Sequence, residues 1–407
     1  MYICTCIFTK KINSINLIFN DMKNFVLLQW LAILFFATGV GYAQPRIWYV
    51  DPNVQQQQAP LLSGDSWDQA TSLAYALSQA APLDTIWCLR GTYEIYASVP
   101  DGVSIYGGFE GWETHLNQRE LNLDFTAYPP LSSLFNPVPY YYSILTSDPN
   151  YIGLNVNKHI LSVSGADQVL IDGFIFMDGG SLYTSGGGLY LDAVTNSVFR
   201  NLIFLDNTGH SGAGLYASFS TGNTMENVIF CNNNSVAAGG GMYLYECFFY
   251  IWNVLFVANQ SQLGGGFFLE NSTAHMYHLT TAVNMADTGR AGYVSNSTLH
   301  VHNSVIYGDT NTIDTIYIRS ISPPDIVYTY SILYPIASYY QDNTCSNVNP
   351  MLANPNFYDC SLQSNSPCIN TGNNLYDPIN ITKDVIGNVR KWDGIVDRGA
   401  YEYQYIR

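Results

Sequence analysis

The sequence predicts an all-β fold in which short parallel strands wind into a stack of similar coils, and three features lead to this prediction. The first is a repeat between Leu170 and Ile306, in which two corner residues and a glycine-rich element recur in the same order. The copies begin at Gly173, Asn201, Asn227, Asn253, His278 and Asn303, which are 28, 26, 26, 25 and 25 residues apart. A fixed period of this size indicates a stacked array of repeats.

The second feature is the kind of residue that marks each copy. The second markers lie six residues after the first, at Gly179, Asn207, Asn233, Asn259 and Asn284. Apart from His278, both columns contain only glycine or asparagine, which adopt the left-handed backbone conformation most easily. We therefore expect a corner at both markers and a third corner at the glycine-rich element, for example Gly239-Gly240-Gly241.

The third feature is the residues between the corners. Runs such as Leu202-Ile203-Phe204 and Val254-Leu255-Phe256 are β-branched and aromatic, and they are too short for helices. The predicted fold is thus a right-handed parallel β-helix, a three-sided solenoid whose coils of about 26 residues stack roughly 4.8 Å apart. The right-handed sense is the usual one for parallel crossovers.

The same alternation assigns the faces of the predicted strands. Leu202 and Phe204 should point inward and stack on Val228 and Phe230 of the next coil. Leu189 with Leu191 should line the next wall. The asparagines should form structural ladders that bond from coil to coil; they are Asn201, Asn227, Asn253, Asn303, Asn207, Asn233, Asn259 and Asn284.

The repeat resembles that of a known family. Phe204-Leu205-Asp206-Asn207 and Phe256-Val257-Ala258-Asn259 fit the pattern Phe-x-x-Asn, and each is followed by a Gly-Gly-x or similar element. This pairing is similar to the repeat of the bacterial polymorphic outer-membrane proteins. The resemblance implies a β-helical surface protein of the adhesin type.

The N-terminal 43 residues read as a secretion signal. Met22-Lys23-Asn24 precedes an apolar run from Phe25 to Phe36, and Gly41-Tyr42-Ala43 offers small residues for cleavage after Ala43. Translation is therefore expected to start at Met22. The predicted location is extracellular or on the outer cell surface.

Residues 44–125 should form an N-terminal cap and the first coils. Trp48 to Asp51 reads as an edge strand, the segment from Ser66 to Ala80 as a helix, and Asp84 to Leu89 as a strand. A helix before an apolar strand suits a cap over the open end of a solenoid. The pattern resembles the start of many secreted bacterial right-handed β-helix proteins. Residues 126–158, rich in proline and tyrosine, should form a surface excursion, and residues 159–345 the repeat coils.

Residues 346–407 form a different ending. Asn354-Pro355-Asn356-Phe357, the run from Ser366 to Gly372, and Val396-Asp397-Arg398-Gly399-Ala400-Tyr401 follow one another. This segment resembles the choice-of-anchor Q segment of secreted bacterial β-helix proteins. The resemblance implies surface location or release, and we expect the segment to close the helix.

Composition limits the partners. Only 11% of the residues are charged and the net charge is −16, which argues against a nucleic-acid partner. We expect a monomer that contacts an extracellular glycan or a host or neighbouring surface. Six cysteines follow the signal; Cys360–Cys368 and Cys345–Cys360 are candidate disulfides, while Cys231 and Cys247 could equally be buried thiols.

Catalytic residues are few. A polysaccharide lyase needs clustered cations or Ca²⁺, yet residues 120–330 contain only Lys158, Arg200, Arg290 and Arg319 as lysines and arginines. A glycoside hydrolase needs two facing carboxylates, and Asp178 and Asp206 take equivalent places in adjacent coils, about 5 Å apart. A structural role at a corner is the favoured reading of this pair. No cofactor and no metal site is predicted, with a Ca²⁺ ion left open.

Two columns of outward-facing side chains suit ligand binding better than catalysis. Tyr190, Tyr216, Tyr243 and Phe268 follow the glycine-rich corner in successive coils. A second column precedes the asparagine corner and comprises Asp172, Arg200, Glu226, Trp252, Tyr277 and His302. Flat rings in register, with few charges, suit stacking on a neutral glycan. The predicted function is a secreted or surface protein that binds a glycan in an adhesin-like manner without catalysis. The alternative is a polysaccharide lyase or glycoside hydrolase.

Overall fold

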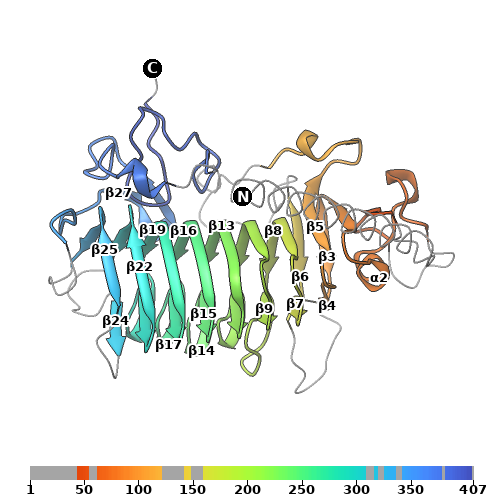
Figure 1. Cartoon of the computed structure of the whole chain (residues 1–407), viewed down its shortest axis with the longest axis horizontal. Coiled ribbons are helices and arrows are strands. Elements are labelled where there is room, and N and C mark those ends of the chain that lie inside the picture. The colour runs from red at the N-terminus through yellow and green to blue at the C-terminus, as the bar shows by residue number, and fades with distance from the viewer. Residues whose placement is uncertain are drawn as a thin grey trace, which may run out of the picture. The chain divides into compact units, whose positions relative to one another are not determined.

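The structure is a computed structural model that describes residues 44–54, 62–121, 142–147, 159–308, 316–319, 325–335, 342–377 and 381–405 (Figure 1). The account below concerns the compact unit Arg46–Arg407. The predicted signal, including Met22 and the cleavage site, lies outside the described residues. So do residues 122–125 of the predicted cap and first coils, and residues 126–141 and 148–158 of the predicted excursion. Across the described part of the chain, no helix is both long and apolar enough to cross a membrane.

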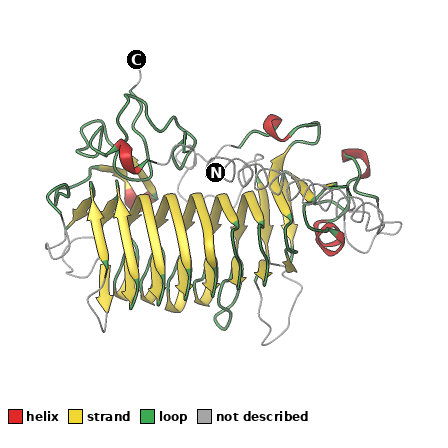
Figure 2. Cartoon of the chain, in the orientation of Figure 1, coloured by secondary structure: helices red, strands yellow, loops and turns green. Residues whose placement is uncertain are grey.

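The predicted right-handed parallel β-helix is confirmed (Figure 2). Sheet A has 14 strands: β1 (Ile47–Val50), β2 (Thr85–Leu89), β3 (Gly91–Glu94), β5 (Ser104–Phe109), β6 (Ser143–Thr146), β8 (Leu170–Met177), β10 (Val198–Leu205), β13 (Thr221–Cys231), β16 (Phe248–Val257), β19 (Thr273–Ala282), β22 (Thr298–His302), β23 (Val305–Tyr307), β25 (Ile326–Thr329) and β26 (Ile332–Tyr334). Sheet B has eight: β4 (Ala97–Ser98), β7 (Leu161–Ser164), β9 (Leu189–Asp192), β12 (Leu215–Ser218), β15 (Met242–Tyr245), β18 (Phe267–Glu270), β21 (Gly292–Ser295) and β24 (Ile316–Arg319). Sheet C has four: β11 (Thr208–Ser211), β14 (Asn234–Ala238), β17 (Gln260–Leu263) and β20 (Met285–Thr288).

Like residues stack in the interior, as the alternation predicts. Leu202 pairs with Val228 and Phe204 with Phe230 in parallel register. The rings of Phe204 and Phe230 are stacked with centroids 4.8 Å apart. Leu189 and Leu191 line the opposite wall and are fully buried. Stacking therefore gives one continuous apolar core along the coils.

The first asparagine column forms the vertical file that the repeat predicts. Asn201, Asn227 and Asn253 all have positive φ, at 54°, 53° and 50°. The side-chain amide of Asn227 donates to Asn201 (3.2 Å), and that of Asn253 donates to Asn227 (2.9 Å). At this corner each long strand of sheet A bends into a first arm, before the asparagine, and a second arm after it.

The second column differs from the prediction. The residue with positive φ lies one position earlier, as at Asp206 (55°) and Asn232 (54°), so Asn207 and Asn233 are not the corner residues. Instead these asparagines are buried ladder residues. Asn207 donates to Phe176 O and to Asn233 Oδ1, both at 2.9 Å, and Asn259 continues the ladder to Asn284 at 3.0 Å. A buried amide needs partners for its donors and its acceptor, and the neighbouring coil supplies both.

Each coil also has a fourth left-handed corner that the repeat does not predict. It lies between sheet B and the next first arm, and its residues are Ala193, Phe219, Glu246, Asn271 and Asn296. The sequence hides this corner because its residues share no common type. The three predicted corners are therefore corrected to four.

The N-terminal part joins sheet A through β1, β2 and β5, which pair in parallel. The predicted helix from Ser66 is two shorter pieces, the 3₁₀ turn η1 (Trp67–Gln69) and α2 (Leu73–Gln79). The break arises because Thr71 bridges to Val50 as a strand residue. Ser72 then caps α2 by accepting a hydrogen bond from Tyr75 N (3.3 Å). A second 3₁₀ turn, η2 (Leu116–Gln118), follows β5.

Part of the predicted excursion belongs to the solenoid. β6, inside residues 126–158, pairs in parallel with β3 and with the second arm of β8. Its consecutive apolar residues Ile144 and Leu145 are both buried, Leu145 in the inner core and Ile144 in a core on the outer side. The excursion is therefore divided by a strand.

The C-terminal segment does more than close the helix. Ser346 bridges to Ile332 and extends the stack, as an end cap would. The rest packs along the outer face of sheet A, and it contains the antiparallel pair β27 (Leu352–Asn354) and β28 (Asp359–Leu362) with the 3₁₀ turns η4 (Pro355–Phe357) and η5 (Asn374–Tyr376). In Figure 1 this segment is drawn in blue above β16, β19 and β22.

A second apolar core lies between this segment and the second arms. Ile203, Ile229 and Leu255 point outward from the solenoid, yet each is at most 2% exposed. They pack against a set from the C-terminal segment that includes Cys360, Cys368, Val385 and Tyr401. Cys345, Cys360 and Cys368 are free thiols, so neither candidate disulfide is formed, and Cys231 and Cys247 are buried thiols.

Candidate functional site

A cluster of rings lies on the outer face of the first arms of β16, β19 and β22. Along each strand, outward residues alternate with fully buried ones such as Ile251, Met276 and Val301. We call the outward rings, together with one ring from η5, the ring array: Tyr250, Trp252, His275, Tyr277, His300, His302 and Tyr376. Parallel register places the members in adjacent coils side by side.

The rings of the array contact one another in an almost continuous path. Centroid distances are 6.0 Å from Trp252 to Tyr277 and 5.0 Å from Tyr277 to His302. Tyr250 lies 5.8 Å from Trp252 and 5.3 Å from His275. Tyr250 is 36% exposed, and the indole nitrogen of Trp252 is buried with no hydrogen-bond partner among the described residues. The array is thus an aromatic surface at the outside of the solenoid.

Burial keeps two of the three imidazoles neutral at pH 7. It lowers the pKa of His302 to about 4, with His300 and His275 as further causes. It also lowers the pKa of His275, and nearby His300 acts in the same direction. Asp325 Oδ2 lies 3.3 Å from His300 Nε2. The ring-bearing end of the predicted column therefore carries little charge.

The other end of the column is charged but internally paired. Asp172 Oδ2 lies 2.9 Å from Arg119 Nη2 and 2.9 Å from Arg200 Nε. Asn201 also donates to Asp172 Oδ1 (2.7 Å). Burial raises the pKa of Glu226, although Arg200 opposes this shift. Asp172 and Arg200 therefore brace the first coils rather than presenting free charges.

The tyrosine column on sheet B is a continuous stack. Tyr190, Tyr216, Tyr243 and Phe268 are stacked with centroids 5.6, 5.1 and 4.9 Å apart. The stack continues to His159 at one end and to Tyr293 and Tyr317 at the other, which the repeat pattern did not single out. Tyr293 and Tyr317 stand at equivalent register positions, and that register is the signal that could have found them. His159 lies outside this register, because Ser162 is the residue that pairs with Tyr190.

This stacking limits what the tyrosine column can bind. Each inner ring already has a ring on both faces, and Phe268 and Tyr293 are both buried. The hydroxyl of Tyr243 donates to Glu270. Glycan binding by this column stays a prediction; its inner rings, like Trp252 and Tyr277 of the ring array, would offer a sugar their edges.

Asp178 and Asp206 lie at equivalent corners of adjacent coils, as predicted. Burial raises the pKa of both carboxyls, and for Asp178 the charge of Asp206 adds to the effect. Asp206 Oδ1 accepts a hydrogen bond from Asn232 (2.5 Å). Both aspartates have positive φ, which accounts for short polar residues at these positions without any catalytic role. Catalysis by this pair stays a prediction.

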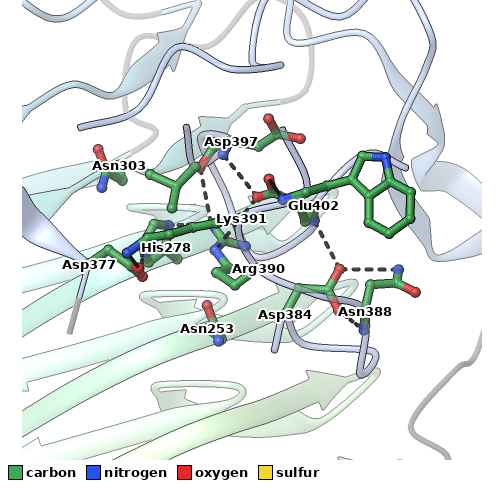
Figure 3. Close-up of polar contacts among 12 residues, drawn as sticks. Asn253, His278, Asn303, Asp377, Asp384, Asn388, Arg390, Lys391, Asp397 and Glu402 are labelled. Carbon is green, nitrogen blue, oxygen red and sulfur yellow. Dashed lines mark hydrogen bonds and ion pairs between the residues drawn. The ribbon is translucent and has the colours of Figure 1, made fainter. Parts of the chain in front are cut away.

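A buried polar junction joins the C-terminal segment to the solenoid (Figure 3). It adjoins the ring array, because His278 directly follows Tyr277 in β19. Arg390 Nη2 donates to His278 Nδ1 and to the carbonyl oxygen of Asp397 (3.0 Å). On the other side of the imidazole, His278 Nε2 lies 3.3 Å from Asp377 Oδ1, and Lys391 Nζ lies 2.7 Å from Asp377 Oδ2. We call His278, Asp377, Arg390 and Lys391 the junction.

The junction fixes the protonation of its histidine. Because Arg390 can only donate, Nδ1 must be the acceptor and the proton must sit on Nε2, facing Asp377. Burial and the charge of Arg390 lower the pKa of His278 to about 3. Burial raises the pKa of Asp377, but His278 and Lys391 outweigh it, so the net shift is downward. The junction therefore contains a neutral histidine between two charged partners.

A second contact lies one coil further on. Asn303 Nδ2 donates to Asn373 O (2.9 Å), and Asn303 Oδ1 accepts from Asn373 N (2.8 Å). Asn303 is thus a predicted ladder residue that bonds the C-terminal segment, as is Asn253, whose Nδ2 donates to Lys383 O (2.7 Å). Tyr277 and His302 of the ring array directly precede His278 and Asn303, so the array and these contacts share two strands.

Metal ligands are not gathered at either place. No group of three or more His, Cys, Asp or Glu side chains able to hold a metal ion occurs among the described residues. His275, His300 and His302 lie near one another through ring contacts. Binding of a Ca²⁺ ion stays a prediction.

Comparison with known proteins found similarity to solved structures but to no family model and no curated protein. Pectate lyase Pel9A is 14% identical over 89% of this chain and 98% of its own, with a TM-score of 0.39. The alginate lyase from Paenibacillus sp. str. FPU-7 is 13% identical over 68% and 96%, with a TM-score of 0.31. The cedar pollen allergen jun a 1 is 11% identical over 75% and 79%, with a TM-score of 0.40.

Proposed function

We propose that this protein is exported, acts outside the cell or on its surface, and binds a neutral glycan through the ring array in an adhesin-like manner. The observation that carries the proposal is the array itself, in which rings from three adjacent coils and the C-terminal segment gather at the outer face of sheet A. Aromatic side chains with polar tips suit a surface that is partly apolar and partly wet. Sugars present the same mixture of C–H faces and hydroxyl groups.

The charge pattern favours an uncharged ligand. Within the array the imidazoles of His275 and His302 are neutral at pH 7 because burial lowers their pKa. The nearby Arg200 is paired with Asp172, and Lys391 with Asp377. An anionic polymer would find no free cationic cluster among these residues. The whole chain, with a net charge of −16, would also repel it.

One observation favours a second candidate function, hydrolysis of a glycosidic bond. Asp178 and Asp206 occupy adjacent coils, and the raised pKa of both is a property expected of a general acid. Adjacent coils lie roughly 4.8 Å apart, which is close to the carboxyl separation of a retaining glycosidase. The hydrogen bond from Asn232 to Asp206 shows that one of the two also serves the corner.

The test is affinity gel electrophoresis of the purified protein with hydroxyethylcellulose or galactomannan as neutral probes, and polygalacturonate as the anionic probe. We expect retardation by at least one neutral probe and none by polygalacturonate. Trp252→Ala should weaken retardation about tenfold, as loss of a central ring contact would. Tyr183→Ala is the matched control, because Tyr183 is 81% exposed and lies outside the array.

The same samples decide between binding and cleavage. Each probe is incubated with the protein and assayed for new reducing ends and for the absorbance of unsaturated sugars. Turnover that disappears in Asp206→Asn would replace the binding proposal by hydrolysis. Equal retardation of the wild type and Trp252→Ala would overturn the role of the array.

A further inference from the structure

We propose that the C-terminal segment completes the glycan site: Tyr376 is a ligand-contacting residue, and the buried Asn303 is its positioning residue. This inference rests on the proposed function of the ring array. It goes beyond that function because it makes affinity depend on a residue that no ligand can reach.

The ring of Tyr376 extends the array in the closest contact of the path. It stacks on His302 with centroids 4.3 Å apart and an interplanar angle of 4°. Tyr330, from the next coil, lies 6.0 Å away and is tilted by 49°. Tyr376 is the array's one member from outside the coils. Its neighbour Leu375, in the same short turn, is 90% exposed and projects away.

Asn303 holds the start of this turn. It is fully buried, and its side chain bonds both backbone groups of Asn373: Asn303 Oδ1 accepts from Asn373 N, and Asn303 Nδ2 donates to Asn373 O. Asn373 in turn caps η5, because its side chain accepts a hydrogen bond from Leu375 N (3.0 Å). The path from the solenoid to the ring of Tyr376 is therefore three residues long and hydrogen-bonded throughout.

The junction holds the other end of the turn. Asp377 follows Tyr376 directly and is placed by Lys391 at 2.7 Å and His278 at 3.3 Å. Two adjacent coils thus anchor the residues on either side of Tyr376. These anchors hold the backbone of Tyr376 beside His302.

The asparagine column itself offers a matched control for Asn303. Asn227 has the same left-handed backbone, at φ 53° against 51°, but its side chain bonds to Asn201 and Asn253 within the solenoid. Glycine at either position keeps the backbone conformation and removes only the amide. The two variants therefore lose a comparable side chain, and only one of them releases η5.

The experiment measures the apparent Kd for the neutral polysaccharide that retards the wild type, by affinity electrophoresis over a range of probe concentrations. We expect Tyr376→Ala to weaken binding about three- to tenfold, the worth of one ring contact. Tyr376→Phe should retain binding within about twofold. Asn303→Gly should weaken it about as much as Tyr376→Ala, whereas Asn227→Gly and Leu375→Ala should bind as the wild type does.

The outcomes separate the two proposals. If Trp252→Ala loses binding while Tyr376→Ala binds as the wild type does, the array binds glycan without the C-terminal segment, and this inference is overturned. If Tyr376→Ala is weakened but Asn303→Gly is not, Asn303 has no positioning role. If no neutral probe binds the wild type, the proposed function itself has failed. Circular dichroism of every variant shows that the coils are intact.

Discussion

At the residue scale, the places where the repeat is broken are explained by contacts that the repeat does not contain. His278 replaces asparagine in the corner column because it accepts a hydrogen bond from Arg390 and faces Asp377. Thr280 stands where other coils have Leu, Ile or Val, and its hydroxyl accepts a hydrogen bond from Ala400 N (2.8 Å). The irregular copy is thus where the C-terminal segment docks.

The buried amide ladder gives the first stability prediction. Asn233→Ala removes the donor to Phe204 O and the acceptor used by Asn207, both of which are buried. Groups left without a partner in the interior should lower the free energy of unfolding by roughly 1–3 kcal/mol. Asn234→Ala, at the exposed neighbouring position, is the control and should change it little. Urea unfolding followed by circular dichroism measures both. Equal midpoints for the two variants would contradict a stabilising ladder.

At the element scale, the C-terminal segment is an outer layer on sheet A, and one signal in the sequence could have revealed it. Second arms such as Leu202-Ile203-Phe204-Leu205 are apolar at every position, which is the pattern of a strand buried on both faces. Alternation alone predicts the inward residues and leaves Ile203 and Leu205 without a partner. What covers them could not be predicted, because the covering segment is irregular and has no period.

The same layer should respond to pH through Glu402. Burial raises its pKa from 4.5 to about 8, so folding favours the protonated acid. The stability that this group contributes is complete below pH 4.5 and is lost as the pH rises toward 8. His278 acts in the opposite sense: its pKa falls from 6.5 to about 3, so its contribution is complete above pH 6.5 and is lost on acidification.

Docking of the C-terminal segment should therefore be weaker at pH 8.5 than at pH 6. Hydrogen exchange of residues 381–401, measured by mass spectrometry at both pH values and corrected for the intrinsic rate, should show this loss of protection. Glu402→Gln, which cannot ionise, should show a smaller difference between the two pH values. A variant with the wild-type pH dependence would assign the effect to Asp384 or Asp397, whose pKa values burial also raises.

At the scale of the whole molecule, each coil pairs mainly with the coils before and after it, so coils should be removable. Deleting residues 201–226 joins Arg200 to Asn227 and keeps every corner and ladder in register. The product should be a folded β-helix shorter by one coil, about 4.8 Å. Deleting residues 201–213 removes half a coil and should abolish folding. The sheet B strand β12 would then follow the first arm of β10 directly and would lie where a strand of sheet A is required. Circular dichroism and small-angle scattering distinguish the two outcomes. Aggregation of the whole-coil deletion would contradict the modular stack.

The sequence was sufficient to predict the stack but only part of the site. Asn201, Asn227 and Asn253 gave the file of corners, and the register they set placed Trp252 beside Tyr277. The sequence could not predict that Tyr376 lies beside His302, because this contact joins two segments that are far apart in the chain. It also could not show that the tyrosine column on sheet B uses up its own ring faces, since the spacing of residues does not give their orientation.

The second core has a consequence for the order in which the chain can be made. Ile203, Ile229 and Leu255 emerge from the ribosome more than a hundred residues before Val385 and Tyr401, which hide them. A nascent chain therefore exposes an apolar strip along its folded coils until the C-terminal segment has been synthesised. A delay in the synthesis of the C-terminal segment therefore leaves an aggregation-prone intermediate. A chaperone would have to cover its apolar strip until the C-terminal segment docks.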